Sequence, residues 1–363
     1  MGAEFCYKLP FFHQARKNIM YNAIESLHPG NFAFVMATGI ISVALEAQGF
    51  SGLSFIFSII AIIAWVILLL LCIVRAIGFY KAVFIDLTSP RMVFSYFTLV
   101  AATDIVGLLL HSHGFATLAV VCWFIAFTCW CLLLYLAFSV LTFMSHEQNV
   151  NIMHGGWLIT IVGTQSLVLL GITIAPSFGE YMHYMMMEVH LLWGLGLVLY
   201  GIFVTLFCYR IFFLSLKPQD LSPLLWVVMG AAAISANGGT SLLESQDQLP
   251  FLTNQKPFID GITLMIWSWA TWLIPLLALF GIWKHIVHKG PLAYEPIVWS
   301  MVFPLGMYTV ASERIGHIAQ FPPMIWISQI MILIALIAWA LSLTGLLSKI
   351  WRLMTAGASL NIS

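Results

Sequence analysis

The chain has 363 residues, of which 61% are hydrophobic and only 8% charged, and its formal net charge is zero. Soluble domains carry about 25% charged residues, so this composition excludes an ordinary soluble protein. The Lys and Arg residues form no basic tract, which argues against a nucleic-acid partner.

Ten apolar segments are long enough to cross a bilayer as helices, which takes about 20 residues each. They cover about residues 31–48, 52–74, 90–111, 115–138, 155–175, 184–214, 221–244, 259–286, 296–313 and 323–351. Each run is continuous rather than alternating, as expected of helices. We therefore predict an all-α integral membrane protein whose transmembrane domain covers 29–352. Residues 1–28 would form a cytoplasmic leader, which could include an interfacial helix, and 353–363 a short cytoplasmic tail.

The basic residues are distributed unevenly between the two sides of this ten-helix topology. All but Lys256 and Arg314 precede the first segment, follow the last, or lie in loops after even-numbered segments. Cytoplasmic loops carry the excess of Lys and Arg. The sequence thus predicts a multi-pass protein of the inner (plasma) membrane with both termini in the cytoplasm.

The odd-numbered segments open with a similar phrase, marked by Pro29, Pro90, His154, Pro223 and Pro296. An aromatic residue follows each mark after three or four positions, and the spacing leaves room for one helical hairpin per repeat. Small and polar residues gather in these segments, whereas most even-numbered segments are almost purely apolar. We therefore predict five hairpins around a quasi-fivefold central pore, with the odd helices inside. Tight helix packing without a pore is the competing interpretation.

Phe303 and Pro304 form the most informative local pair. Pro304 lies near the middle of the ninth segment, where it would kink the helix and fix the direction of Phe303. Phe303 is the seventh residue after its mark, and the equivalent residues of the other copies are Met36, Phe97, Ile161 and Gly230. A ring of such residues at one depth predicts a constriction gated by Phe303. Ordinary core packing is the alternative.

Further candidates are the small and charged residues of the odd segments. Pore-lining or packing roles are both open for Gly39, Gly163 and Gly306. Asp104 lies within the third segment and would either bind a proton or make a structural hydrogen bond. Near the outer ends, Glu46, Glu244 and Glu313 could line the mouth or simply be solvated, and Arg314 could pair with one of them.

Covalent chemistry finds little support in the sequence. His183 and His190 share a helix face and could ligate haem in a membrane enzyme, but no partner segment offers further ligands. No hydrolase, Walker or dinucleotide motif is present. We expect no catalytic residue, metal or cofactor.

Two phrases resemble the tellurite-resistance/dicarboxylate transporter family, which includes bacterial tellurite-resistance proteins, yeast malate permeases, fungal sulfite efflux pumps and plant slow-type anion channels. They are PGNFAFVMATGI at 29–40 and WSMVFPLGMY at 299–308. The resemblance implies five hairpins around an anion pathway, a homotrimer with one pore per subunit, and a pore-occluding phenylalanine at Phe303. We expect a channel or transporter for small anions: C4-dicarboxylates, sulfite, related oxyanions, halide or nitrate. A proton-coupled dicarboxylate carrier using Asp104 is the alternative.

Overall fold

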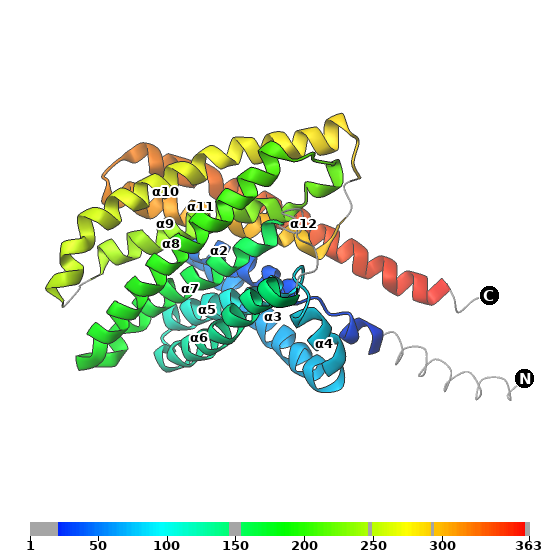
Figure 1. Cartoon of the computed structure of the whole chain (residues 1–363), viewed down its shortest axis with the longest axis horizontal. Coiled ribbons are helices and arrows are strands. Elements are labelled where there is room, and N and C mark those ends of the chain that lie inside the picture. The colour runs from blue at the N-terminus through cyan, green and yellow to red at the C-terminus, as the bar shows by residue number, and fades with distance from the viewer. Residues whose placement is uncertain (1–20, 145–153, 246–248, 292–293, 360–363) are drawn as a thin grey trace, which may run out of the picture.

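The structure is a computed structural model that describes residues 21–144, 154–245, 249–291 and 294–359. These residues form helices and no strand, which confirms the all-α prediction. Figure 1 shows the described chain starting and ending at the same end of the helical bundle. The leader prediction falls mostly on residues 1–20, outside the described part.

Five helices make up the interior: α2 (Ala33–Ala47), α5 (Phe97–Ser112), α7 (Ile159–Ile174), α9 (Trp226–Glu244) and α11 (Trp299–Ile318). Each begins with a short 3₁₀ turn, and these turns cover Pro29–Phe32, Val93–Tyr96, Gly155–Leu158, Pro223–Leu225 and Pro296–Val298. The repeated phrase of the sequence therefore encodes this turn. In the second copy the turn begins three residues after Pro90, so Pro90 precedes the helical structure rather than opening it.

Five longer helices follow the interior ones in alternation: α3 (Ser51–Gly78), α6 (Ala116–Ser139), α8 (Met182–Phe213), α10 (Pro250–Ile282) and α12 (Pro322–Ser359). Each packs against the interior helix that precedes it in the chain and also touches the next interior helix. The five interior helices contact one another in a closed cycle, α2–α5–α7–α9–α11 and back to α2. We call this cycle the inner ring.

The interior helices are more buried than the outer ones, as the small and polar residues of the odd-numbered segments predict. In α9, 89% of the most apolar stretch is buried, and in α5 83%, against 17% in α3 and 28% in α12. Large apolar side chains on the outer helices, such as Ile67 and Leu341, are exposed, as is suitable for contact with lipid.

Eight segments of the described chain are helical, long and apolar enough to cross a membrane. One of the eight, Gly155–Phe213, contains both α7 and α8, while α11 is not among them. Polar residues such as Glu313 and Arg314 lower the hydropathy of α11, and its burial inside the ring makes a lipid-compatible surface unnecessary. The count of ten crossings and the fivefold symmetry stay predictions.

A belt of tryptophans joins successive hairpins. In every case an indole N–H on an outer helix donates to the inner helix of the next hairpin. Four donate to hydroxyls, at 2.8–3.1 Å: Trp65 to Thr103, Trp130 to Thr164, Trp267 to Ser312 and Trp339 to Thr38. Trp193 donates to the carbonyl of Ser235 at 2.9 Å. Since no water competes inside a bilayer, these bonds satisfy groups that would otherwise be unpaired.

The structure corrects three sequence-based boundaries. A short helix, α4 (Tyr80–Leu87), follows α3 where the sequence suggested only a loop. Helix α10 starts at Pro250 rather than near 259, and it contains Pro257 in its first turns. Helix α12 continues to Ser359, into the predicted tail.

Candidate functional site

The 3₁₀ turns of the five inner helices meet at one end of the inner ring. They touch one another in the same cyclic order as the helices that follow them. Helix N-termini carry a partial positive charge and unpaired N–H groups. Five such termini gathered at one end of the ring make this end favourable for an anion.

Histidines cap two of these turns in the same way. The Nδ1 atoms of His28 and His154 accept hydrogen bonds from the backbone N–H of Gly30 and Gly156, at 2.9 and 3.1 Å. A Cβ at either glycine would approach the imidazole Nδ1 to 2.7 Å, so the cap needs glycine two residues later. Burial lowers the pKa of His28, and it lowers the pKa of His154 to about 4, which keeps these acceptor nitrogens unprotonated.

This shared cap also refines the alignment of the repeats. Because His154 caps its turn as His28 does, Gly155 rather than His154 corresponds to Pro29. Counting seven residues from Gly155 gives Val162, one residue beyond Ile161. Both residues are buried, as are Met36 and Phe97.

Phe303 points into the inner ring. It precedes Ser312 by nine residues, which is two and a half turns at 3.6 residues per turn and places the two residues on opposite faces of the helix. Ser312 faces outward, because it accepts the indole N–H of Trp267 on α10. Phe303 therefore faces away from the outer helix, and it is only 2% exposed.

Pro304 packs directly against Gly230. A Cβ built on Gly230 would lie 2.7 Å from Cγ and 3.0 Å from Cβ of Pro304. The glycine thus leaves room for the proline ring at the α9–α11 contact. Gly230 was expected in the constriction ring, and the space beside it is filled by Pro304.

The other small residues also lie at contacts between inner helices. The missing Cβ of Gly39 faces Ile105 of α5, that of Gly163 faces Phe97 of α5, and that of Gly306 faces Ile40 of α2. Pore-lining and packing roles were both open for these glycines, and these contacts correspond to close packing between the inner helices.

Asp104 is completely buried between α5 and α7. Ser166 Oγ lies 2.6 Å from its Oδ2 and 2.8 Å from the carbonyl oxygen of Gly163. The single hydroxyl proton cannot fully serve both acceptors, whereas a protonated Asp104 would supply a second proton. Oδ1 of Asp104 has no partner among the described residues.

The inner helices terminate at the opposite end of the ring. The residues eleven positions after the constriction residues share their helix faces and lie three turns, or about 16 Å, further along. Ala47 is exposed there, Leu108, Thr173 and Arg314 are half-buried, and Ser241 is buried. We call this end of the inner ring, marked by these five residues, the outer vestibule.

Arg314 is held at the vestibule by α9. Its Nη1 donates to Oδ1 of Asn237 at 3.0 Å and to Oγ of Ser241 at 2.6 Å, and its Nη2 pairs with the carboxylate of Glu244. Of the three carboxylates that could have paired with Arg314, the structure selects Glu244.

The other two carboxylates have different partners. Glu313 is buried, with Oε1 3.2 Å from Nε2 of His317 and Oε2 unpartnered among the described residues. Glu46 is exposed and accepts a hydrogen bond from the Ser51 hydroxyl at 2.9 Å. Neither is bonded to Arg314.

The histidine pair of α8 does not form a ligand set. Nδ1 of His183 lies 2.9 Å from the carbonyl of Glu180, and Nδ1 of His190 lies 2.6 Å from that of Met186. Across the described chain, no three His, Cys, Asp or Glu side chains gather as a metal site would require.

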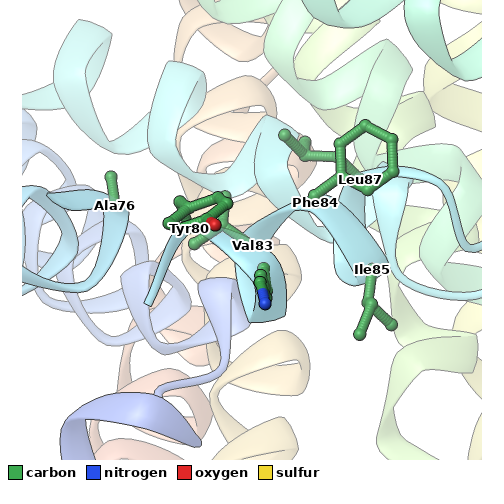
Figure 2. Close-up of a pocket in the computed structure, with 7 residues that line it drawn as sticks. Ala76, Tyr80, Val83, Phe84, Ile85 and Leu87 are labelled. Carbon is green, nitrogen blue, oxygen red and sulfur yellow. The ribbon is translucent and has the colours of Figure 1, made fainter. Parts of the chain in front are cut away.

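Figure 2 shows a surface pocket whose lining comes from the end of α3 and from α4, including Tyr80, Phe84 and Leu87. The pocket is apolar and includes no inner-ring residue. It therefore has no part in the arrangement around Phe303.

Sequence reasoning missed the capping histidines, the tryptophan belt, and the roles of Asn237 and Ser241. The two His-x-Gly tripeptides at 28–30 and 154–156 were a visible signal for the caps. Tryptophans in the middle of apolar segments were a signal for the belt, because a buried indole N–H needs an acceptor.

Residues 26–347 match the SLAC1 family, described as voltage-dependent anion channels. The chain belongs to this family. The match covers both phrases that carried the resemblance and all five inner helices.

Three known proteins are similar to this chain. An uncharacterised transporter of Methanocaldococcus jannaschii is 22% identical over 342 residues, which are 92% of this chain and 97% of that protein. The sulfite efflux pump SSU1 of Arthroderma benhamiae is 22% identical over 335 residues, 84% of this chain and 85% of the pump. An uncharacterised membrane protein of Mycobacterium tuberculosis is 38% identical over 138 residues, 38% of this chain and 70% of that protein.

This SLAC1-family protein is thus a multi-pass integral membrane protein of an anion-transport family. It is a transport protein and not an enzyme. The membrane haem enzyme considered from the sequence is thereby set aside.

Proposed function

We propose that the protein is a channel for small anions whose path runs through the inner ring and is blocked by Phe303. The observation that carries this proposal is the closed cycle of five helix N-termini at one end of the ring. Their partial charges attract anions without a basic side chain in the membrane interior. Sulfite is the first anion to test, because a relative is a sulfite efflux pump, followed by C4-dicarboxylates such as malate, nitrate and halide.

The gate is tested with Phe303→Ala in proteoliposomes. Removing the ring opens space at the constriction, so anion flux should rise several-fold. The matched control is Phe203→Ala, since Phe203 is also 2% exposed but lies on the outer helix α8, where it packs among Phe94, Trp157 and Phe138. Equal increases in both variants would indicate a nonspecific leak and would contradict the gate.

A proton-coupled carrier is the second candidate. The Ser166 hydroxyl favours it, because its single proton is shared between the Asp104 carboxylate and the Gly163 carbonyl. Asp104→Asn cannot bind or release a proton and should abolish uptake driven by a pH gradient. Ser166→Ala is the control, because it removes the hydrogen bond and keeps the titrating carboxyl group. Unchanged uptake in Asp104→Asn would leave the channel as the mechanism.

The assembly and orientation belong to the same proposal. We propose a homotrimer, on the family resemblance, with one pathway per subunit in the inner (plasma) membrane and both termini in the cytoplasm. Native mass spectrometry of the detergent-solubilised protein tests the trimer.

A further inference from the structure

Arg314 has a defined position, a fixed orientation and a solvent-exposed side chain, and it plays no part in the proposed gate at Phe303. It follows Phe303 by eleven residues, so it lies on the same inward face, at the outer vestibule. Asn237 and Ser241 fix its guanidinium from α9. The side chain is still 30% exposed.

The partner of Arg314 is also accessible. The Glu244 side chain is 41% exposed and lies at the last residue of α9, beside the vestibule. Exposed ion pairs hold together weakly, because water screens and solvates both charges. If Glu244 swings away, Asn237 and Ser241 still hold the guanidinium toward the vestibule.

We propose that Arg314 is an oxyanion-binding site in the outer vestibule and that Glu244 is a tethered carboxylate occupying it when no anion is bound. The planar guanidinium matches the paired oxygens of a carboxylate or of sulfite. Glu244 already places one carboxylate oxygen against Nη2 of this guanidinium. An incoming anion replaces Glu244, and the carboxylate then turns to solvent. This inference rests on the proposed anion pathway, for which it supplies the outer recognition step.

The neighbouring charges do not provide an equivalent site. Glu313 is engaged with His317, and Glu46 with Ser51. Glu244 is therefore the carboxylate that competes with an anion for Arg314, and substituting Glu244 alone measures this competition.

The central experiment measures sulfite influx into proteoliposomes as a function of sulfite concentration on the vestibule side. Glu244→Gln should lower the half-saturating concentration about threefold, the scale of an exposed charge pair. Arg314→Gln should raise it, and in the double variant the gain from Glu244→Gln should disappear. Asp260→Asn, on an exposed face of α10, removes the same charge near the same end without freeing an arginine, and should change little.

Equal shifts in Glu244→Gln and Asp260→Asn would show long-range electrostatics and would overturn the site. A gain that persists in the double variant would also overturn it. Arg314→Lys, which keeps the charge but not the fork, replaces Arg314→Gln if that variant fails to fold, and it too should raise the half-saturating concentration.

Binding without transport separates this inference from the proposed function. Sulfite should raise the melting temperature of the wild type and, at lower concentrations, that of Glu244→Gln, but not that of the double variant. If these shifts in melting temperature are seen but the wild type shows no sulfite flux, the binding site is supported and the proposed function is contradicted. Flux in the wild type with identical sulfite shifts in all variants would keep the function and remove the site.

Discussion

His28 and His154 show how a titratable residue can serve as a fixed structural part. Each imidazole must keep Nδ1 free of a proton to accept a backbone N–H at the start of an inner helix. Nε2 of His154 lies 3.1 Å from the carbonyl of Arg91, which ties the α7 turn to the segment before α5. Protonation would break the cap and place a positive charge beside helix N-termini that are already positive.

We predict a stability loss in mild acid that depends on His154. Its pKa is lowered to about 4 in the folded protein, below the ordinary 6.5, so the unfolded chain binds the extra proton first. The contribution is complete above pH 6.5 and is lost as pH falls toward 4, with a slope of at most about 1.4 kcal/mol per pH unit. His154→Asn, which can also cap, should lack this part of the pH dependence in thermal unfolding. An identical pH profile in both proteins would contradict it.

Gly230 provides a second prediction at the residue scale. Gly230→Ala would push the new methyl group into Pro304 and should destabilise the protein by about 1–3 kcal/mol. Gly261→Ala on α10 is the matched control, because no atom lies within 4 Å of its Cβ position. Alanine is the better helix former, so the control should be neutral or slightly stabilising. Melting temperatures in detergent compare the two variants.

The tryptophan belt acts at the scale of elements. Each indole joins one hairpin to the next, so the belt ties the ring together in addition to helix packing. Small residues allow the inner helices to approach, and the belt then fixes which outer helix covers each joint.

We predict that Trp130→Phe lowers stability by about 1 kcal/mol, the net contribution of one buried hydrogen bond. The variant removes the 2.8 Å bond to Thr164, whose hydroxyl keeps its own bond to the Thr160 carbonyl. Trp272→Phe on α10 is the control, because Trp272 is 49% exposed. A similar loss in both variants would assign the effect to ring size and not to the bond.

The sequence predicted the elements that depend on local composition. The polar texture identified the interior helices, because small and hydroxyl side chains suit helix contact and not lipid. Helix α4 was missed, since eight residues with exposed Tyr80 and Phe84 do not reach the length of a membrane span. The start of α10 was placed near 259, where the apolar run begins, whereas the helix extends back through Pro257 and polar residues to Pro250.

The pairings across helices could not be predicted from the sequence. Trp65 and Thr103 meet only because α3 packs against α5, the inner helix of the next hairpin. Asn237 meets Arg314 only because α9 and α11 are neighbours in the inner ring and these two residues lie at the same depth. Relative depth depends on helix starts, and the shift of one residue at Gly155 shows how easily an alignment by phrase misplaces it.

At the scale of the whole molecule, the charge distribution predicts the orientation in the membrane. In a background without the native cysteines, Ser51→Cys should react with a membrane-impermeant thiol reagent applied to the outside of intact cells. Ser215→Cys should react only after the membrane is opened. Both serines are exposed in the structure. The opposite labelling pattern would reverse the topology and place the helix N-termini outside.

The contact between α12 and α2 has a consequence for biosynthesis. Gln48 donates to the Ser328 hydroxyl at 2.9 Å and Trp339 to Thr38 at 3.0 Å, so α12 completes the wall beside α2. During synthesis that seam stays open until α12 enters the bilayer. Until then, polar groups of α2 such as the Thr38 hydroxyl lack their partners on α12, and polar groups that face lipid are costly. The α2 side of the ring is therefore covered only once α12 is in place, so closure of the wall depends on contacts between helices far apart in the sequence.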